Sequence, residues 1–271
     1  PKEFFDRFPV DDIILPEIKE NDLDDVPEEG KKIALRKAES FTYIKQEKRY
    51  KEAVQAYLAS TSYADHLVGM ILEGLEKSPY AKNTIVVLWS DHGWHIGKKG
   101  ISGKNTLWDD STRVPLIFAG PGVKAGQVCK KPAELLDVYP TLLEMCGLPE
   151  NKKLEGHSLL SQLQDAQASR KWPAITTHNA GNHGIRTENW RFIQYADGSR
   201  ELYDMRKDPN EWKNLAKDPK YGKIVDKHLR FVPQNDRPPA PGSAHRILTM
   251  EKGQVIWQEK KVGPEDPIPG L

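Results

Sequence analysis

A strand-like run that ends in metal-ligand chemistry is the segment of this sequence with the clearest chemical potential. Residues 84–89 (T-I-V-V-L-W) are apolar and mostly β-branched, which is typical of a strand buried on both faces, and Ser90-Asp91-His92-Gly93 follows directly. In open α/β sheets ligands bind beyond the carboxyl ends of the strands, so we expect Asp91 and His92 to project into a crevice. A carboxylate supplies hard oxygen ligands, and an imidazole supplies a further ligand or a hydrogen bond to an anion. The sequence therefore predicts a metal or anion site at this point.

Helical and strand-like segments alternate on both sides of this run. From about residue 47 to residue 77, apolar residues recur at helical spacing, which predicts a long amphipathic helix ahead of the strand. Residues 114–119 predict a further strand that is closed by a Gly-Pro-Gly turn. Asp137 and Gly147 are expected to cap and to stop a short helix. This alternation is typical of a doubly wound α/β sheet.

The pattern changes in the second half of the sequence, where short strand-like runs separated by turn residues predict a small antiparallel sheet. These runs cover residues 174–177, 184–187, 191–195 and 201–203. From Pro233 onward the chain is rich in proline and is expected to be extended. We therefore expect an α/β domain over residues 1–150, followed by a C-terminal subdomain with the small sheet and an extended tail over residues 151–271.

Composition narrows the classes of function. The formal net charge is +1, so no surface-wide polyanion-binding face is expected, and nucleic acid is not an expected partner. No stretch reaches the apolar length of a membrane span. Cys129 and Cys146 are too few for a disulfide framework, and we expect them to be separate buried thiols.

The long context of the Asp-His-Gly motif resembles the type I sulfatases of the alkaline-phosphatase superfamily, most of all the branch that contains iduronate-2-sulfatase. The resemblance begins in the stretch from Ser90, S-D-H-G-W-H-I-G-K-K-G-I-S-G-K-N-T-L-W-D-D-S-T-R-V-P-L-I-F-A-G-P-G. Further pieces match in order on both sides, namely D-L-D-D-V-P, L-L-D-V-Y-P-T-L-L-E-M-C-G-L-P and E-L-Y-D-M-R-K-D-P-N-E-W-K-N-L-A. The resemblance implies part of an alkaline-phosphatase-like sandwich, with a mostly parallel sheet flanked by helices, plus a small C-terminal antiparallel-sheet subdomain.

The resemblance also implies parts that this sequence does not contain. Sulfatases of this type carry a C-x-P-x-R signature whose cysteine becomes a formylglycine nucleophile, together with further acidic calcium ligands. Neither Cys129 nor Cys146 stands in such a signature. We therefore expect the chain to be the C-terminal portion of a sulfatase that binds Ca²⁺, with the N-terminal part of the same enzyme as a possible partner. The resemblance further implies a periplasmic, extracellular or lysosome-like location.

Three residues carry the expected chemistry by their match to the family. Asp91 matches a calcium-binding position, and the alternative is an aspartate that caps the following turn. His92 matches a residue that either coordinates the same ion or contacts the sulfate, and it could also support a ligand by hydrogen bonding. Lys104 matches a lysine that reaches the sulfate and stabilises the leaving oxygen, whereas Lys98 and Lys99 in the same loop are expected to be mostly solvated.

Other residues are candidates for contacting the substrate. His95 lies close to Asp91 in sequence, although a packing role is the leading alternative for it. Asn182 and His183 resemble residues that a C-terminal subdomain lends to a substrate pocket, with a turn-forming asparagine and a surface histidine as the alternative. Arg113 belongs to the family pattern and is expected to anchor the turn at Asp109 by ion pairing.

Three functions remain open from the sequence. The first is a sulfuric-ester hydrolase acting on a sulfated glycan or a related sulfate ester, with the nucleophile supplied by a part that this chain lacks. The second is a phosphomonoester or phosphonate hydrolase of the same superfamily. The third is a noncatalytic chain that binds a sulfated ligand or completes a partner.

Overall fold

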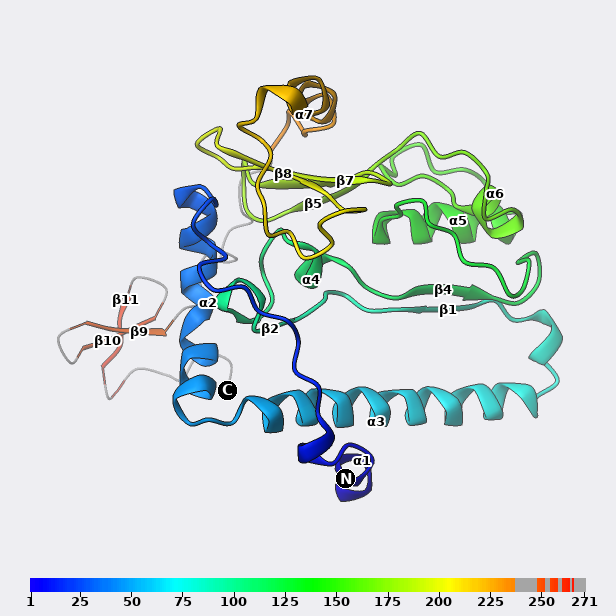
Figure 1. Cartoon of the computed structure of the whole chain (residues 1–271). Helices are drawn as coiled ribbons and strands as arrows, with labels where there is room; N and C mark the ends of the chain where they lie inside the picture. Colours follow the sequence, from blue (N-terminus) through cyan, green and yellow to red (C-terminus); the bar gives the residue numbers. More distant parts are fainter. Residues whose placement is uncertain (237–247, 252–253, 258–259, 264, 266–271) are drawn as a thin grey trace. The chain divides into compact units, whose positions relative to one another are not determined.

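The computed structural model describes residues 1–236, 248–251, 254–257, 260–263 and 265, in two compact units, Pro1–Val232 and Pro233–Leu271. The helices of the first unit are α1 (Lys2–Asp6), α2 (Glu28–Gln46), α3 (Tyr50–Glu76), α4 (Asp109–Thr112), α5 (Val138–Met145), α6 (Leu160–Gln164) and α7 (Gly222–Leu229) (Figure 1). Its strands are β1 (Val86–Trp89), β2 (His95–Ile96), β3 (Ser102–Gly103), β4 (Leu116–Ala119), β5 (Ala174–Thr177), β6 (His183–Arg186), β7 (Trp190–Gln194) and β8 (Arg200–Asp204). The second unit holds β9 (Leu248–Glu251), β10 (Gln254–Trp257) and β11 (Lys260–Lys261).

The helices predicted from periodicity are present. The predicted long helix is α3, and Phe4 of α1 packs edge-on against Tyr63 of α3 with ring centroids 5.0 Å apart. Gly147 follows the end of α5 with φ 64°, as expected for a helix stop. Asp137 is buried, but its carboxylate does not cap α5. Instead it accepts hydrogen bonds from the backbone N–H groups of Glu134 at 2.8 Å and His157 at 2.7 Å, so it ties together the loops around that helix.

Strand β1 forms where the sequence predicted it, but the prediction that both of its faces are buried is wrong. Leu88 and Trp89 are exposed, and so is Ile117 on the neighbouring strand. Strand β1 pairs with β4 alone in an antiparallel two-stranded ladder, so no further strand of the described residues lies beside them. Every strand pairing in the part of the chain that the structure describes is antiparallel, so the expected parallel part of the sheet is not formed by these strands.

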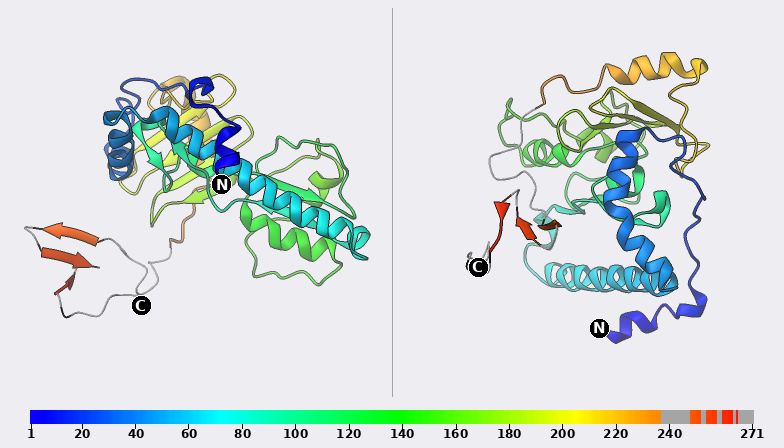
Figure 2. Two further views of the ribbon diagram at one scale, coloured as in Figure 1. Left: turned by 90° about the horizontal axis from the view of Figure 1, so that it is seen from below. Right: turned by 90° about the vertical axis from the view of Figure 1, so that its left-hand side faces the viewer.

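The four-stranded sheet of order β5-β6-β7-β8 confirms the antiparallel sheet predicted for the second half of the sequence. One face packs against α7 through Phe192 and Val225, which belong to one hydrophobic cluster, and Figure 2 shows α7 along the sheet. The other face contributes Ile193 and Tyr195 to a second cluster, which includes Trp108 next to α4. Residues on alternate sides of each strand therefore belong to two hydrophobic clusters, and the sheet packs against the segment that leads into α4.

The remaining predictions on the fold have mixed outcomes. Cys129 and Cys146 are free thiols as expected, but both are exposed rather than buried, because each lies in or beside a loop. The extended tail predicted from Pro233 lies partly outside the described residues, and its described strands form the antiparallel sheet β11-β10-β9. The predicted domain boundary near residue 150 stays a prediction. Among the described helices, none combines the length and the apolar character needed to cross a bilayer.

Candidate functional site

The carboxyl end of β1 presents Asp91 and His92 as the sequence predicted. The Asp91 side chain is 74% exposed, and that of His92 is 31% exposed. Ser90 follows the strand, and its Oγ donates to the carbonyl oxygen of His92 at 3.0 Å, which fixes the turn between them. Asp91 therefore offers an accessible carboxylate at the end of the strand.

Lys104 meets His92 across the following loop. Its Nζ lies 2.6 Å from His92 Nε2, and the other ring nitrogen, Nδ1, lies 2.8 Å from the carbonyl oxygen of Gly93. Because a carbonyl only accepts, Nδ1 carries the proton and Nε2 accepts from the lysine ammonium. Asp91 Oδ1 lies 3.6 Å from the same Nε2. The structure thus brings Asp91, His92 and Lys104 together as a carboxylate, an imidazole and an ammonium group.

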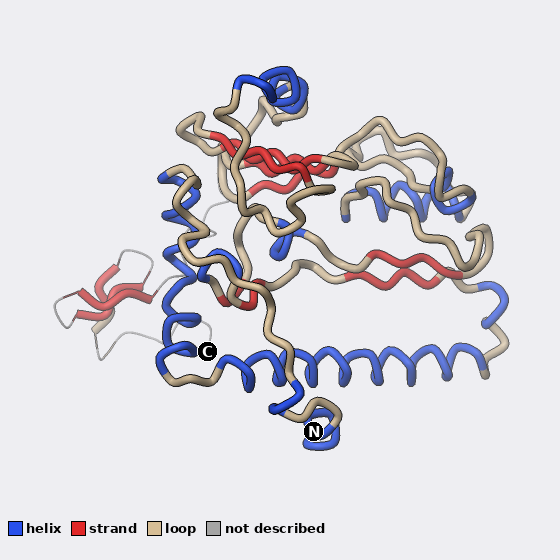
Figure 3. The backbone as a smooth tube through the Cα atoms, viewed as in Figure 1, coloured by secondary structure: helices blue, strands red, loops and turns tan. Residues whose placement is uncertain are grey.

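A short hairpin positions Lys104. Strands β2 and β3 pair in register, with His95 opposite Gly103, and Lys104 follows β3 directly. The segment between β1 and β4 is otherwise mostly loop (Figure 3). Gly93 fixes this segment against α4, because a Cβ at that position would lie 2.1 Å from the carbonyl oxygen of Asp110. Only glycine permits so close an approach of the two backbones.

The prediction that Lys99 is solvated is wrong. Lys99 is 2% exposed, and its Nζ lies 2.8 Å from Asp22 Oδ1 and also donates to the carbonyl oxygen of Glu211. Its ammonium is further placed over the ring of Trp108, 5.7 Å from the centroid. Lys98 is also more enclosed than predicted, because its ammonium pairs with Asp110 at 3.1 Å. The loop that carries Lys104 is therefore anchored from within the protein.

His95 lies inside the protein. It is buried, with Nε2 2.8 Å from Thr106 Oγ1 and Nδ1 3.8 Å from Asp110 Oδ2. Burial lowers the pKa of His95 to about 4, against the opposing attraction of Asp110. This geometry is that of a neutral histidine that holds the loop, and a direct contact of His95 with substrate stays an untested prediction.

Asn182 and His183 lie at the start of β6, away from Asp91 in sequence. Asn182 Oδ1 accepts from the backbone N–H of Ala196 at 3.2 Å, which ties two turns of the sheet together. His183 is buried, with Nδ1 3.0 Å from Thr177 Oγ1. Neither residue lines the groove described next, and their predicted role in substrate binding is not tested by this arrangement.

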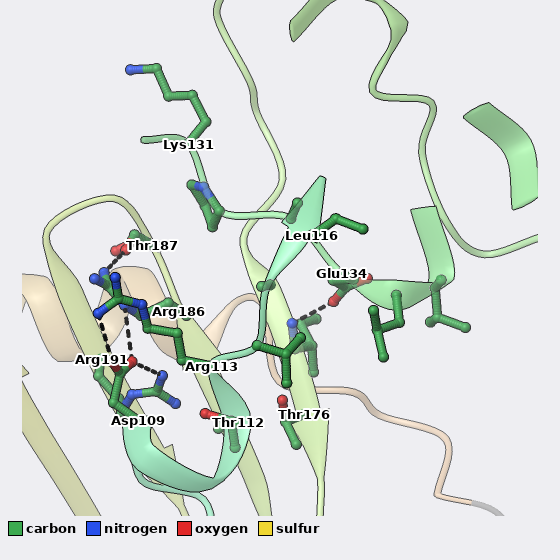
Figure 4. A pocket seen from close by; sticks show the side chains of 18 of the residues that line it. Asp109, Thr112, Arg113, Leu116, Lys131, Glu134, Thr176, Arg186, Thr187 and Arg191 are labelled. Atoms are coloured by element: carbon green, nitrogen blue, oxygen red, sulfur yellow. Dashed lines mark hydrogen bonds and ion pairs between the residues drawn. The ribbon is translucent and has the colours of Figure 1, made fainter. Parts of the chain in front are cut away.

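A groove of about 1100 Å³ opens beside Asp91 and His92. It runs between the β4 segment and the strands β5 and β6, and Figure 4 shows part of its lining, with Arg113 and Arg186 beside Asp109. Burial acts to raise the pKa of Asp109. The guanidinium groups of Arg191 and Arg186 outweigh that effect and hold the pKa below its usual value. The groove therefore has a basic cluster close to the end of β1.

Sequence reasoning missed Arg186 and Arg191, which come from β6 and β7. These two arginines stand directly opposite each other in the strand register. Like charges directly opposite each other destabilise a hairpin unless an anion compensates them, and Asp109 supplies that anion. A hairpin register drawn from the sequence would have shown that these two positive charges face each other.

Two family patterns match the sequence over this region. The pattern described as "Sulfatase" matches residues 21–148, and the pattern described as "N-sulphoglucosamine sulphohydrolase, C-terminal" matches residues 97–234, which is just over half of the chain. The chain belongs to the sulfatase family. The candidate site residues Asp91, His92 and Lys104 all lie inside the first match.

Relatives of this sulfatase chain agree with the assignment. It is 40% identical over 237 residues to a protein named sulfatase from Formosa agariphila, covering 87% of this chain and 47% of the relative. It is 33% identical over 202 residues to a Delta 4,5-hexuronate-2-O-sulfatase from Bacteroides thetaiotaomicron, covering 69% and 41%. A solved structure described as a 2-O GAG sulfatase superposes with a TM-score of 0.68 at 29% identity, covering 81% of this chain and 51% of that chain.

These comparisons confirm the predicted superfamily and fold class. The sulfatase chain has the alkaline-phosphatase-like fold of its solved relatives, with the small antiparallel sheet as part of it. The chain spans about half the length of the curated relatives that it matches.

The donor set of this sulfatase fits part of a calcium site. Calcium binds about six to eight oxygen ligands, and Asp91 offers an accessible carboxylate for one or two of them. Within the described residues, no group of three or more His, Cys, Asp or Glu side chains gathers in a way that could hold a metal ion. The Nε2 of His92 accepts from Lys104 in this structure, so the imidazole faces the ammonium group. Asp91 is thus the residue that fits the ion, whereas the ammonium group of Lys104 fits an anion and His92 orients it.

Proposed function

We propose that this chain forms part of a sulfuric-ester hydrolase that acts on a sulfated glycan. The observation that carries the proposal is the contact of Lys104 with His92 beside the exposed carboxylate of Asp91, within the sulfatase match. Cleavage of a sulfate ester places negative charge on the leaving oxygen, and an ammonium group at that point stabilises it. The names of two relatives, a hexuronate-2-O-sulfatase and a 2-O GAG sulfatase, support a sugar as the substrate.

Each residue of the constellation has a separate role in this proposal. Lys104 donates to a sulfate oxygen or to the departing alcohol oxygen, and His92 orients its ammonium through Nε2. Asp91 would hold Ca²⁺, which supplies positive charge that fixes and polarises the sulfate oxygens when bound. The formylglycine nucleophile would have to come from outside these 271 residues, because neither cysteine stands in a C-x-P-x-R signature. We further propose that the enzyme acts in the periplasm, outside the cell or in a lysosome-like compartment.

The 271-residue chain by itself should show no sulfatase turnover. Covalent catalysis needs a nucleophile, and the sequence does not contain the one that the family uses. The measurement is hydrolysis of an activated aryl sulfate and of sulfated disaccharides at millimolar calcium. The control is a protein that contains this chain together with a C-x-P-x-R segment, which should hydrolyse the sulfates faster than matched phosphates. Turnover that follows the purified 271-residue chain through chromatography would contradict this division of labour.

Calcium should stabilise the 271-residue chain by about 1 kcal/mol or less. An ion held by one carboxylate binds weakly, and a ligand near its Kd adds only RT ln(1 + [L]/Kd) to the stability. The measurement is the thermal midpoint in chelator and in millimolar calcium, with Asp91→Asn as the matched control that removes the remaining shift. A shift of many degrees in this chain would show that it holds a complete ion site of its own.

A further inference from the structure

Three guanidinium groups surround the carboxylate of Asp109 in the groove. Arg191 Nη2 lies 2.5 Å from Asp109 Oδ1, Arg186 Nε lies 3.7 Å from the same oxygen, and Arg113 Nη1 lies 3.9 Å from Oδ2 (Figure 4). The arginines come from different segments: Arg113 follows α4, and the other two lie on β6 and β7. Only Arg191 is within hydrogen-bond distance of the carboxylate, so the other two pair with it weakly.

The charges of this cluster do not balance. Arg191 Nε also lies 3.1 Å from Glu211 Oε1, so this buried arginine pairs with both nearby carboxylates, those of Asp109 and Glu211. Burial raises the pKa of Glu211 to about 8, against the opposing effect of Arg191. Even with Glu211 charged, the three arginines outnumber the two carboxylates. Arg113 and Arg186 are left with a net positive charge between them. Burial, and after it the charge of Arg191, lower the pKa of Arg186, while Asp109 and Glu211 oppose that change.

The two arginines are placed where a substrate would reach them. Both line the groove that Asp91 and His92 also line. The Arg113 side chain is 81% exposed, and its backbone carbonyl packs against Gly93, 3.0 Å from a Cβ built there. Arg113 is therefore held beside the segment Asp91-His92-Gly93 while its guanidinium remains accessible.

We propose that Arg113 and Arg186 bind a second anionic group of the substrate, a carboxylate or a further sulfate, beside the sulfate ester that is cleaved. Planar guanidinium groups bind both kinds of oxyanion in bidentate fashion. This inference rests on the proposed function, because it extends the site along the groove that Asp91 and His92 line. It makes the enzyme selective for sugars with at least two anionic groups.

Another basic residue of the groove supplies a matched control. Lys131 also lines the groove, but its Nζ lies 2.8 Å from Glu188 Oε2, so its charge is already compensated. If anions were attracted only by the net charge of the groove, Lys131→Gln and Arg113→Gln would weaken binding alike, because each removes one positive charge. A dedicated subsite would involve Arg113 and Arg186 alone.

The test is calorimetric titration of the 271-residue chain with two pairs of sugars at up to millimolar concentration. In the first pair, a 2-O-sulfated hexuronate disaccharide is compared with its carboxyl-reduced form. In the second, a disulfated glucosamine is compared with a monosulfated one. We expect about tenfold tighter binding of the doubly anionic member, which corresponds to about 1.4 kcal/mol. The pair that shows the preference identifies the second group as a carboxylate or a sulfate.

Arg113→Gln should abolish this preference and leave binding of the singly anionic sugar unchanged, whereas Lys131→Gln should keep the preference. Arg186→Gln should act as Arg113→Gln does. If it unfolds because Arg186 also donates to the carbonyl oxygens of Thr187 and Glu188, the exposed Arg113 still decides the question. Equal binding of both members in both pairs, or a preference that survives in Arg113→Gln, would overturn the subsite and leave the proposed function intact. Absence of measurable binding of the doubly anionic sugars at millimolar concentration would overturn the subsite as well. The proposed function is tested separately, by turnover of sulfates against matched phosphates in a protein that also contains the nucleophile.

Discussion

Replacing Lys99 with methionine should lower the free energy of unfolding by about 3–5 kcal/mol. The ammonium group of Lys99 and the carboxylate of Asp22 are 2.8 Å apart, and their side chains are 1% and 4% exposed. Methionine keeps the length of the apolar stem but leaves a charged carboxylate buried without its partner. The loss is a large part of the 5–15 kcal/mol that stabilises a typical domain, so urea denaturation followed by circular dichroism should resolve it easily.

Two controls separate the buried ion pair from a general effect of changing the loop. Lys98→Met removes the neighbouring ammonium, which is partly solvated and pairs with Asp110, so it should cost about 1 kcal/mol or less. Adding Asp22→Asn to Lys99→Met removes the stranded charge and should recover part of the loss, which a double-mutant cycle measures. A Lys99→Met chain as stable as the Lys98→Met chain would show that the pair contributes little.

The elements of the fold could be predicted because their signals are local. The helical spacing of apolar residues placed α3 within a few residues of its observed ends, and turn residues between short apolar runs placed β5 to β8. The Asp91-His92 pair and Lys104 could be named from the motif context alone, and the structure brings all three together. The hairpin β2–β3 that brings Lys104 to His92 spans only a few residues, so the short distance between them in the sequence was enough to predict that they lie close together.

The rest depends on contacts between distant parts of the chain. Lys99 sits among glycines and another lysine, a composition typical of a solvated loop, and it is buried only because Asp22 and the carbonyl of Glu211 meet it. Burial of β1 was predicted from its apolar side chains, yet a strand is covered only if other layers lie over both of its faces. The position of Arg186 opposite Arg191 follows only from the register of the β6–β7 hairpin, which the sequence does not specify directly.

In a turnover-competent protein that contains this chain, Lys104→Ala should lower kcat by about 10² or more. The ammonium group is positioned by His92 Nε2 at 2.6 Å, and charge on the leaving oxygen develops only as the ester bond breaks. Loss of a donor that acts only in the transition state lowers kcat and kcat/KM together, whereas loss of ground-state sulfate binding raises KM. Steady-state kinetics on a sulfated disaccharide would distinguish these cases. Asp91→Ala should abolish turnover, because it removes the charged ligand that this chain offers to calcium.

The same loop provides the control for this prediction. Lys98→Ala removes an ammonium group that pairs with Asp110 rather than with His92, so it should leave kcat within about twofold of the unchanged protein. If Lys104 and His92 act as one unit, the double variant Lys104→Ala with His92→Ala should lose little more activity than either single variant. An unchanged kcat in Lys104→Ala would remove the lysine from the catalytic site. Losses that multiply in the double variant would show that His92 acts on the calcium ion or the sulfate independently of Lys104.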